Sequence, residues 1–207
     1  MTRDALHHLS TSDAVLRRLI RDIGPCTLKP ETRRSPFQSL VNAVAHQQLN
    51  GTAAGTILRR FTKLFPKRRF PRPADMDSVS DESLRGAGFS RAKVAAIRDI
   101  AAKTLSGVVP TSRQIALLTD DEIITRLTEV RGVGRWTVEM LLIFQLGRPD
   151  VLPADDFGVR SGFRSAYRRR EMPTTKELLA RGERWRPFRT TAAWYLWRAA
   201  DRAKKSA

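Results

Sequence analysis

Apolar residues recur along this chain at intervals of three and four positions, which places them on one face of an α-helix. Two segments show the spacing clearly. On a predicted helix from Pro36 to about Gln48 the apolar face consists of Phe37, Leu40, Val41, Val44 and Ala45. On one that follows Ser90 it consists of Val94, Ile97, Ala101 and Leu105. No segment alternates apolar and polar residues as a half-buried strand does. The pattern predicts an all-α protein.

Polar caps and turn residues divide this pattern into helices of ordinary length. Thr11-Ser12-Asp13 can cap a helix through Ile23, which Gly24-Pro25 would end. Thr119–Glu122 and Thr174–Glu177 each match a capping box, in which a Thr hydroxyl and a Glu carboxylate satisfy backbone N–H groups reciprocally. Further helices are predicted over about Thr52–Phe65, Ser80–Gly86 and Phe188–Arg202, with a basic, proline-containing loop over Lys67–Pro73.

The net charge of the chain indicates which class of partner to expect. Lys and Arg number 38 against 21 acidic residues, a net charge of +17. Such an excess attracts a polyanion and favours nucleic acid, with an inert basic surface as the alternative. No apolar run is long enough to span a bilayer and no signal peptide is evident, so we expect no membrane partner and a cytoplasmic location, nucleoid-associated in a bacterium. The single cysteine, Cys26, excludes a disulfide within the chain and a four-cysteine metal site.

A turn with two glycines joins two predicted helices in Leu127–Thr137. Gly132 and Gly134 can take positive φ and allow another backbone to approach, and Val133 can return to the core. The free N–H groups at the start of the next helix can bind a phosphate. A plain turn is the alternative, but the flanking helices and the net charge favour DNA. The predicted DNA-binding residues are Arg131, Gly132, Val133, Gly134, Arg135 and Thr137.

Five segments together resemble the helix-hairpin-helix (HhH-GPD) DNA glycosylase superfamily. In family order they are FQSLVNAVAHQQLNGTAA, GFSRAKVAAIRDIA, GVGRWTVEMLLIF, DVLPADDFGVRSGF and WRPFRTTAAWYLWRAAD, from about Ser35 to Asp201. The closest branch is bacterial 3-methyladenine DNA glycosylase II, in a minimal form without the additional N-terminal domain of the best-known members. The resemblance implies a single glycosylase unit over 1–207 with two helical subdomains and a cleft between them. One would span about 36–118, and the hairpin subdomain about 119–207 together with the N-terminal helix, assigned to 1–35.

Asp155 and Asp156 begin an apolar-patterned helix, where either one alone could be a plain N-cap. The helix dipole keeps a carboxylate there ionised. An ionised carboxylate can stabilise the positive charge that develops on the sugar during N-glycosidic cleavage, or activate water. By resemblance Asp156 matches the catalytic position, and Asp155 caps or supports it. Members that nick DNA use a lysine where this chain has Trp136, so the resemblance implies a monofunctional enzyme that leaves an abasic site.

A glycosylase also needs a pocket for the flipped base and a side chain that fills the gap in the duplex. Alkylated bases are cationic, and an aromatic face favours them by about 0.5–2 kcal/mol. The predicted pocket residues are Trp136, Phe157, Trp194 and Trp197, with core packing as the alternative for each. Two turns compete for insertion, one with Gln48, Leu49 and Asn50 and one with Phe89 and Arg91. Leu49 and Phe89 could also be core residues.

The sequence thus predicts a monomeric glycosylase that removes bases of the 3-methyladenine and 7-methylguanine type from double-stranded DNA, without a protein partner. No metal site is expected, since His46 has no second ligand at metal spacing. No cofactor is required, and the resemblance allows a monovalent cation on the hairpin's backbone carbonyls. Two alternatives stay open: a non-enzymatic helix-hairpin-helix DNA-binding protein, which does not explain Asp156, and a glycosylase for deaminated bases such as hypoxanthine.

Overall fold

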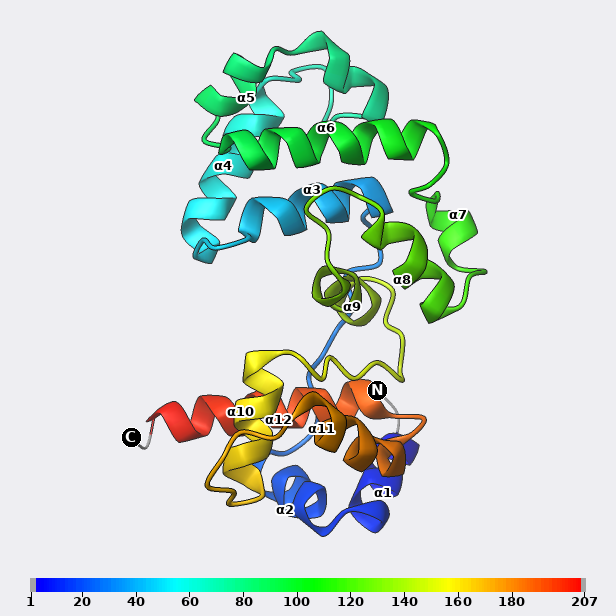
Figure 1. The fold of residues 1–207 in the computed structure, drawn as a ribbon, viewed down its shortest axis with the longest axis vertical. Coiled ribbons are helices and arrows are strands. Elements are labelled where there is room, and N and C mark those ends of the chain that lie inside the picture. The colour runs from blue at the N-terminus through cyan, green and yellow to red at the C-terminus, as the bar shows by residue number, and fades with distance from the viewer. Residues whose placement is uncertain (1–2, 206–207) are drawn as a thin grey trace. The chain divides into compact units, whose positions relative to one another are not determined.

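The computed structural model describes residues 3–205, and over these residues it consists of helices and loops without a strand (Figure 1). The prediction of an all-α protein is confirmed. The chain forms two compact units. Unit 1 combines the described residues of Met1–Thr32 and Leu142–Ala207, and unit 2 is Arg33–Leu141. Unit 2 therefore contains the hairpin together with the helices that precede it, whereas the predicted hairpin subdomain begins near residue 119 and includes the C-terminal helices. Between residues 3 and 205 no helix is both long and apolar enough to cross a membrane.

Unit 2 is built from helices whose first turns are capped by side chains. Ser35, Asn50, Ser80, Ser90 and Thr119 each accept a hydrogen bond from a backbone N–H of the helix that follows. These caps explain why the sequence located most helix starts correctly. The helices of this unit are α3 (Pro36–His46), α4 (Gly51–Lys63), α5 (Asp81–Gly86), α6 (Arg91–Leu105), α7 (Ser112–Ile115) and α8 (Asp120–Thr128), with a 3₁₀ turn over Pro73–Ser78. Helix α9 (Arg135–Phe144) contains the boundary between the units.

Unit 1 contains both ends of the described chain. Its helices are α1 (Arg3–Ser12), α2 (Ala14–Ile23), α10 (Phe157–Ala166), α11 (Thr175–Gly182) and α12 (Arg189–Lys205), with a 3₁₀ turn over Glu183–Trp185. Helix α1 and the short α7 were not predicted. The core of this unit includes Leu9, Leu16, Phe163, Trp185 and Leu196, so the N-terminal helices share it with the C-terminal ones.

A buried carboxylate joins these distant segments. Asp13 is the N-cap of α2, as predicted for its segment, and its side chain is inaccessible to solvent. It accepts hydrogen bonds from the Tyr167 hydroxyl at 2.6 Å, from Arg181 Nε at 2.9 Å and from Trp185 Nε1 at 3.1 Å. Burial alone would raise the pKa of Asp13, but these hydrogen bonds outweigh it and the pKa is lowered. Asp13 is therefore a satisfied, ionised residue of the core.

Helices α10 and α12 pack against each other at a glycine. A Cβ placed on Gly162 would overlap the backbone carbonyl of Leu196, so only glycine fits there without a shift of the backbone. One turn earlier, a Cβ on Gly158 would lie 2.8 Å from Cδ1 of Trp197. The two glycines therefore form the surface of α10 over which α12 passes.

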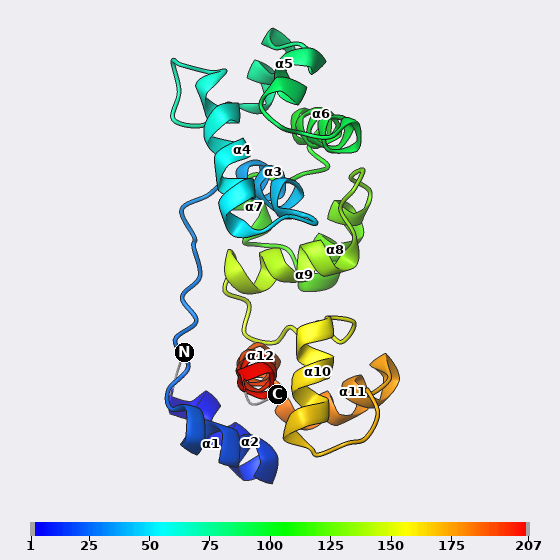
Figure 2. The ribbon, with the colours of Figure 1, turned by 90° about the vertical axis from the view of Figure 1, so that its left-hand side faces the viewer.

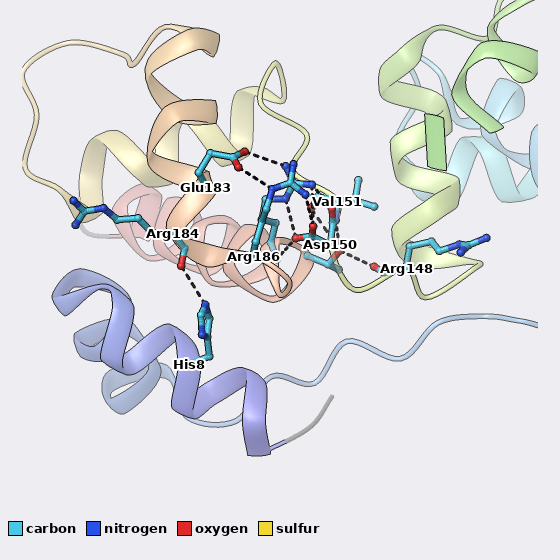
Figure 3. A network of polar contacts seen from close by, with 9 residues as sticks. His8, Arg148, Asp150, Val151, Glu183, Arg184 and Arg186 are labelled. Carbon is cyan, nitrogen blue, oxygen red and sulfur yellow. Dashed lines mark hydrogen bonds and ion pairs between the residues drawn. The ribbon is translucent and has the colours of Figure 1, made fainter. Parts of the chain in front are cut away.

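The loop that leads to α10 is fixed by an ion-pair network at the start of α12 (Figure 3). Arg189 contacts both carboxylate oxygens of Asp150, at 2.8 Å and 3.0 Å, and Arg186 Nη1 lies 2.7 Å from Asp150 Oδ2. The backbone N–H of Val151 donates to Thr190 Oγ1 at 3.0 Å. Bidentate Arg–carboxylate pairs are geometrically specific. The network thus holds the segment before Asp155 and Asp156 in place.

Candidate active site

Asp156 is the N-cap of α10, and two donors converge on its Oδ1 atom. The backbone N–H of Val159 donates at 2.8 Å, and the indole Nε1–H of Trp197 donates at 2.8 Å. The side chain is half-buried. Because both bonds fall on one oxygen, the carboxylate is held in a single orientation at the helix start, where the dipole favours negative charge.

Asp155 does not have the capping role, one of the two roles that the sequence left open for it. Capping falls to Asp156 itself, and the exposed Asp155 accepts a hydrogen bond from the hydroxyl of Thr175 at the start of α11. The sequence could not separate the two aspartates on physical grounds, since either one could have reached the first turn of the helix.

Trp197 is joined by an aromatic residue that the sequence analysis did not include. Its indole stacks on the ring of Phe144, with centroids 5.5 Å apart and an interplanar angle of 25°. Phe144 is 42% exposed. Helix α9 is apolar on most positions, so its pattern gave no sign of which residue would stay on the surface. Within unit 1 an oriented carboxylate and an aromatic surface therefore share Trp197.

The other predicted pocket residues differ in accessibility. Phe157, in unit 1, is 69% exposed, and Trp136, in unit 2, is 49% exposed. Trp194 is only 8% exposed and packs edge-on against Tyr195 in the core of unit 1, with ring centroids 4.9 Å apart. The structure therefore gives Trp194 the core role that was its alternative.

The hairpin between α8 and α9 has the predicted conformation at Gly132 and Val133 but not at Gly134. Gly132 has φ +76 and Val133 is 4% exposed in the core, as expected. Gly134 does not have positive φ, so that prediction was wrong for it. The reason is that its carbonyl already accepts the first helical hydrogen bond of α9, from Val138 N–H. A Cβ built on Gly134 would have no atom within 4 Å apart from those of its chain neighbours, and Arg131 and Arg135 are exposed. Thr137 is buried, contrary to its predicted role in binding DNA.

Contacts within unit 2 hold this hairpin against the turn between α3 and α4. Asp99 Oδ2 accepts from the backbone N–H of Arg131 at 2.7 Å, and Gln47 Nε2 donates to the Gly132 carbonyl at 2.9 Å. Lys93 Nζ donates to the carbonyls of Ala45 and Gln47, at 2.9 Å and 2.8 Å, and partial burial lowers the pKa of this lysine. The hairpin and the turn are therefore fixed relative to each other.

That turn is the stronger of the two insertion candidates. Gln48, Leu49 and Asn50 are all exposed, Leu49 by 40%, and the Asn50 side chain caps α4. Phe89 is 3% exposed and packs edge-on against Phe61 at 5.6 Å between centroids, so it is a core residue, contrary to its proposed insertion. Arg91, the first residue of α6, is exposed.

The described residues, 3–205, contain no group of three His, Cys, Asp or Glu side chains that could hold a metal ion. His46 instead lies with its Nδ1 2.8 Å from the carbonyl oxygen of Asn42 in its own helix. This contact is the packed or surface role that the sequence favoured for His46.

The comparisons with known proteins agree on one family. The profile described as HhH-GPD superfamily base excision DNA repair protein matches residues 41–187, more than half of the chain. DNA-3-methyladenine glycosylase 1 of Schizosaccharomyces pombe is 41% identical over 199 residues, which are 95% of this chain and 86% of the relative. The solved structure of a 3-methyladenine DNA glycosylase from that yeast, in complex with abasic DNA, has a TM-score of 0.83 at 42% identity and covers 94% of this chain and 95% of its own. A DNA-3-methyladenine glycosidase structure from Bacillus halodurans has a TM-score of 0.87 at 33% identity and covers 97% and 91%. This chain belongs to the HhH-GPD superfamily of base excision DNA repair proteins.

Proposed function

We propose that this protein is a DNA glycosylase that hydrolyses the N-glycosidic bond of alkylated bases in double-stranded DNA and leaves an abasic site. The observation that carries the proposal is the orientation of the Asp156 carboxylate by Val159 N–H and Trp197 Nε1–H. The relatives named DNA-3-methyladenine glycosylase support the substrate class. The enzyme would act on DNA as a monomer, without a protein partner.

The chemistry needs little beyond this carboxylate and an aromatic surface. As the bond from C1′ to the base nitrogen breaks, its electron pair passes to the base, which loses its positive charge. Asp156 stabilises the positive charge that develops on the sugar. Water then adds its oxygen to C1′ and releases a proton, for which Asp156 is the candidate acceptor. Because the alkylated base leaves as a neutral molecule, no general acid has to protonate it.

The aromatic side chains supply selectivity for a cationic base. Trp197 and Phe144 form a stacked pair in unit 1, and Phe157 and Trp136 are exposed. Stacking of a cationic base on such rings is favoured over stacking of its neutral counterpart by about 0.5–2 kcal/mol. This preference distinguishes alkylated from ordinary bases without a specific hydrogen-bond pattern.

DNA would be held by the hairpin and opened by the neighbouring turn. The N–H groups at the start of α9, with Arg131 and Arg135, would bind phosphates without reading sequence. Leu49, with Gln48 and Asn50, would fill the gap left by the flipped base. Glycosylases of this family need no cofactor. The hairpin's backbone carbonyls could also hold a monovalent cation, although the Gly132 carbonyl already accepts a hydrogen bond from Gln47 Nε2. In a bacterium such an enzyme would act in the cytoplasm, on the nucleoid.

The direct test is the release of free bases from methylated duplex DNA, separated by identity. We expect 3-methyladenine and 7-methylguanine in excess over any unmodified base. Faster release of hypoxanthine from an inosine-containing duplex would assign the protein to deaminated bases instead. Tight binding to the duplex without any base release would indicate a non-enzymatic DNA-binding protein.

The product should be an intact strand that carries an alkali-labile abasic site. Trp136 stands where the nicking members of the family have a lysine, so no amine is available at that position to form a Schiff base with the sugar. The measurement is gel analysis of the damaged strand with and without alkali. A covalent protein–DNA adduct trapped by borohydride, together with nicking before alkali, would contradict the monofunctional assignment.

A further inference from the structure

Seven basic residues and no acidic residue lie between positions 59 and 72. They occupy the end of α4 and the loop that follows it, drawn in cyan and teal in Figure 2. All seven are exposed, and we call them the α4 basic surface: Arg59, Arg60, Lys63, Lys67, Arg68, Arg69 and Arg72. Arg68 forms an ion pair with Asp75 at 2.9 Å. Within residues 3–205 the other six have no carboxylate within ion-pair distance.

The loop that carries part of the α4 basic surface is fixed by contacts with buried residues. The ring of Phe70 packs against Phe61 at 5.7 Å and against Phe37 at 6.2 Å between centroids, and Pro71 is buried. Asp75 accepts a hydrogen bond from the backbone N–H of Arg72 at 2.7 Å, besides its ion pair with Arg68. The exposed cations therefore stand on a fixed loop, so a ligand would not have to order the backbone when it binds.

Fold stability does not account for so many charges. The negative end of the α4 dipole favours cations in the last turn, which explains Arg60 and Lys63. It does not extend to Lys67, Arg69 and Arg72 in the loop. Arg59 and Lys63 are four positions apart on one helix face, a spacing at which like charges destabilise the helix. A bound polyanion would offset this repulsion, because it attracts both cations.

We propose that the α4 basic surface binds the phosphate backbone of the DNA duplex at a distance from the damaged base. The proposal rests on the proposed function only in taking the same duplex as its ligand. Helix α4 starts directly after the exposed Gln48–Asn50 turn, and a helix rises 1.5 Å per residue, so Lys63 lies roughly 20 Å along the helix from that turn. For a duplex that follows α4 this is on the order of six base pairs, at 3.4 Å per pair. The surface lengthens the bound segment of DNA and adds affinity that is independent of sequence.

The test compares two triple variants of equal charge. Arg60→Ala, Lys67→Ala and Arg69→Ala together remove part of the surface. Arg113→Ala, Arg164→Ala and Arg170→Ala remove three exposed arginines elsewhere and serve as the matched control. Binding to an undamaged 30-base-pair duplex is titrated at several salt concentrations. Each lost phosphate contact lowers the slope of log affinity against log salt by about 0.9, so the surface variant should lose roughly 2 to 3 and the control less than 1. Equal slopes for the two variants would overturn the proposal.

Two further measurements locate the contact and separate it from catalysis. On a duplex of about 10 base pairs with a central abasic site, the difference between the two variants should shrink, because five pairs at about 3.4 Å each reach roughly 17 Å along α4, past Arg60 but short of Lys63, after which Lys67 and Arg69 follow. Single-turnover base release at saturating protein should stay within twofold of wild type. If the wild-type protein releases no base, the proposed function is wrong. The salt slopes still show whether the α4 basic surface contacts DNA, because they are measured on an undamaged duplex. A loss confined to single-stranded RNA would make RNA the ligand and would contradict the proposal.

Discussion

Replacement of Asp156 by Asn should reduce single-turnover base release by at least about a hundredfold, the scale on which removal of one transition-state electrostatic group acts. The amide retains an oxygen that can accept from Val159 N–H and Trp197 Nε1–H, and Asn is as good an N-cap as Asp. The fold should therefore persist, with a melting temperature close to that of wild type. DNA affinity should be unchanged or slightly higher, because a negative charge near phosphates is removed.

The neighbouring aspartate is the control for this result. Asp155→Asn removes the same charge one residue earlier, where the carboxylate is exposed and contacts Thr175. We expect a modest loss of rate or stability, since an exposed interaction of this kind contributes little. Wild-type rates for Asp156→Asn, or equal losses in both variants, would remove Asp156 from the catalytic role.

Replacement of Gly162 by Ala should destabilise unit 1 by about 3 kcal/mol or more, because the new Cβ meets the backbone carbonyl of Leu196 rather than a movable side chain. For a chain of this size that is a fall in melting temperature of roughly 6 °C or more. Trp197 follows Leu196 on α12, so base release by the molecules that remain folded should also fall.

Gly86 provides a matched substitution in an open environment. Gly86 ends helix α5, has no positive φ, and a Cβ there would meet no atom within 4 Å apart from its chain neighbours and the backbone of its own helix. Gly86→Ala should leave the melting temperature unchanged or raise it slightly. Thermal melts of the two variants, followed by circular dichroism, separate the packing effect from the general effect of replacing glycine. A Gly162→Ala protein as stable as wild type would show that α10 and α12 are not in the contact described.

The features that could be predicted correctly from the sequence are those that depend on a few adjacent residues. Ser90 and the capping boxes at Thr119 and Thr174 start helices as expected, because a cap needs only the first turn that follows it. Helix α1 was missed because its burial depends on partners far along the chain, with His8 Nε2 3.2 Å from the carbonyl oxygen of Arg184. Phe89 and Trp194 show the same limit, since the aromatic pattern alone does not say which rings are buried.

The candidate site was predicted only in part for the same reason. The resemblance indicated Asp156, but the bond from Trp197 joins positions 41 apart and depends on how α10 and α12 cross. The signal for that crossing was present as Gly158 and Gly162, four positions apart and therefore on one helix face. The turn after α3 gave a comparable result, because Leu49 and Phe89 were equal candidates until their exposure was known.

The buried Asp13 sets the order in which the protein can assemble during synthesis. Its partners Arg181 and Trp185 follow it by 168 and 172 positions. At ribosomal rates of about 5–20 residues per second, that separation corresponds to roughly ten to thirty seconds. Throughout this interval Leu9 and Leu16, which are fully buried in the finished protein, lack the C-terminal half of their core. Unit 2, continuous in sequence, is meanwhile completed, so the segment inserted in the middle of the chain can fold before the unit that surrounds it in sequence.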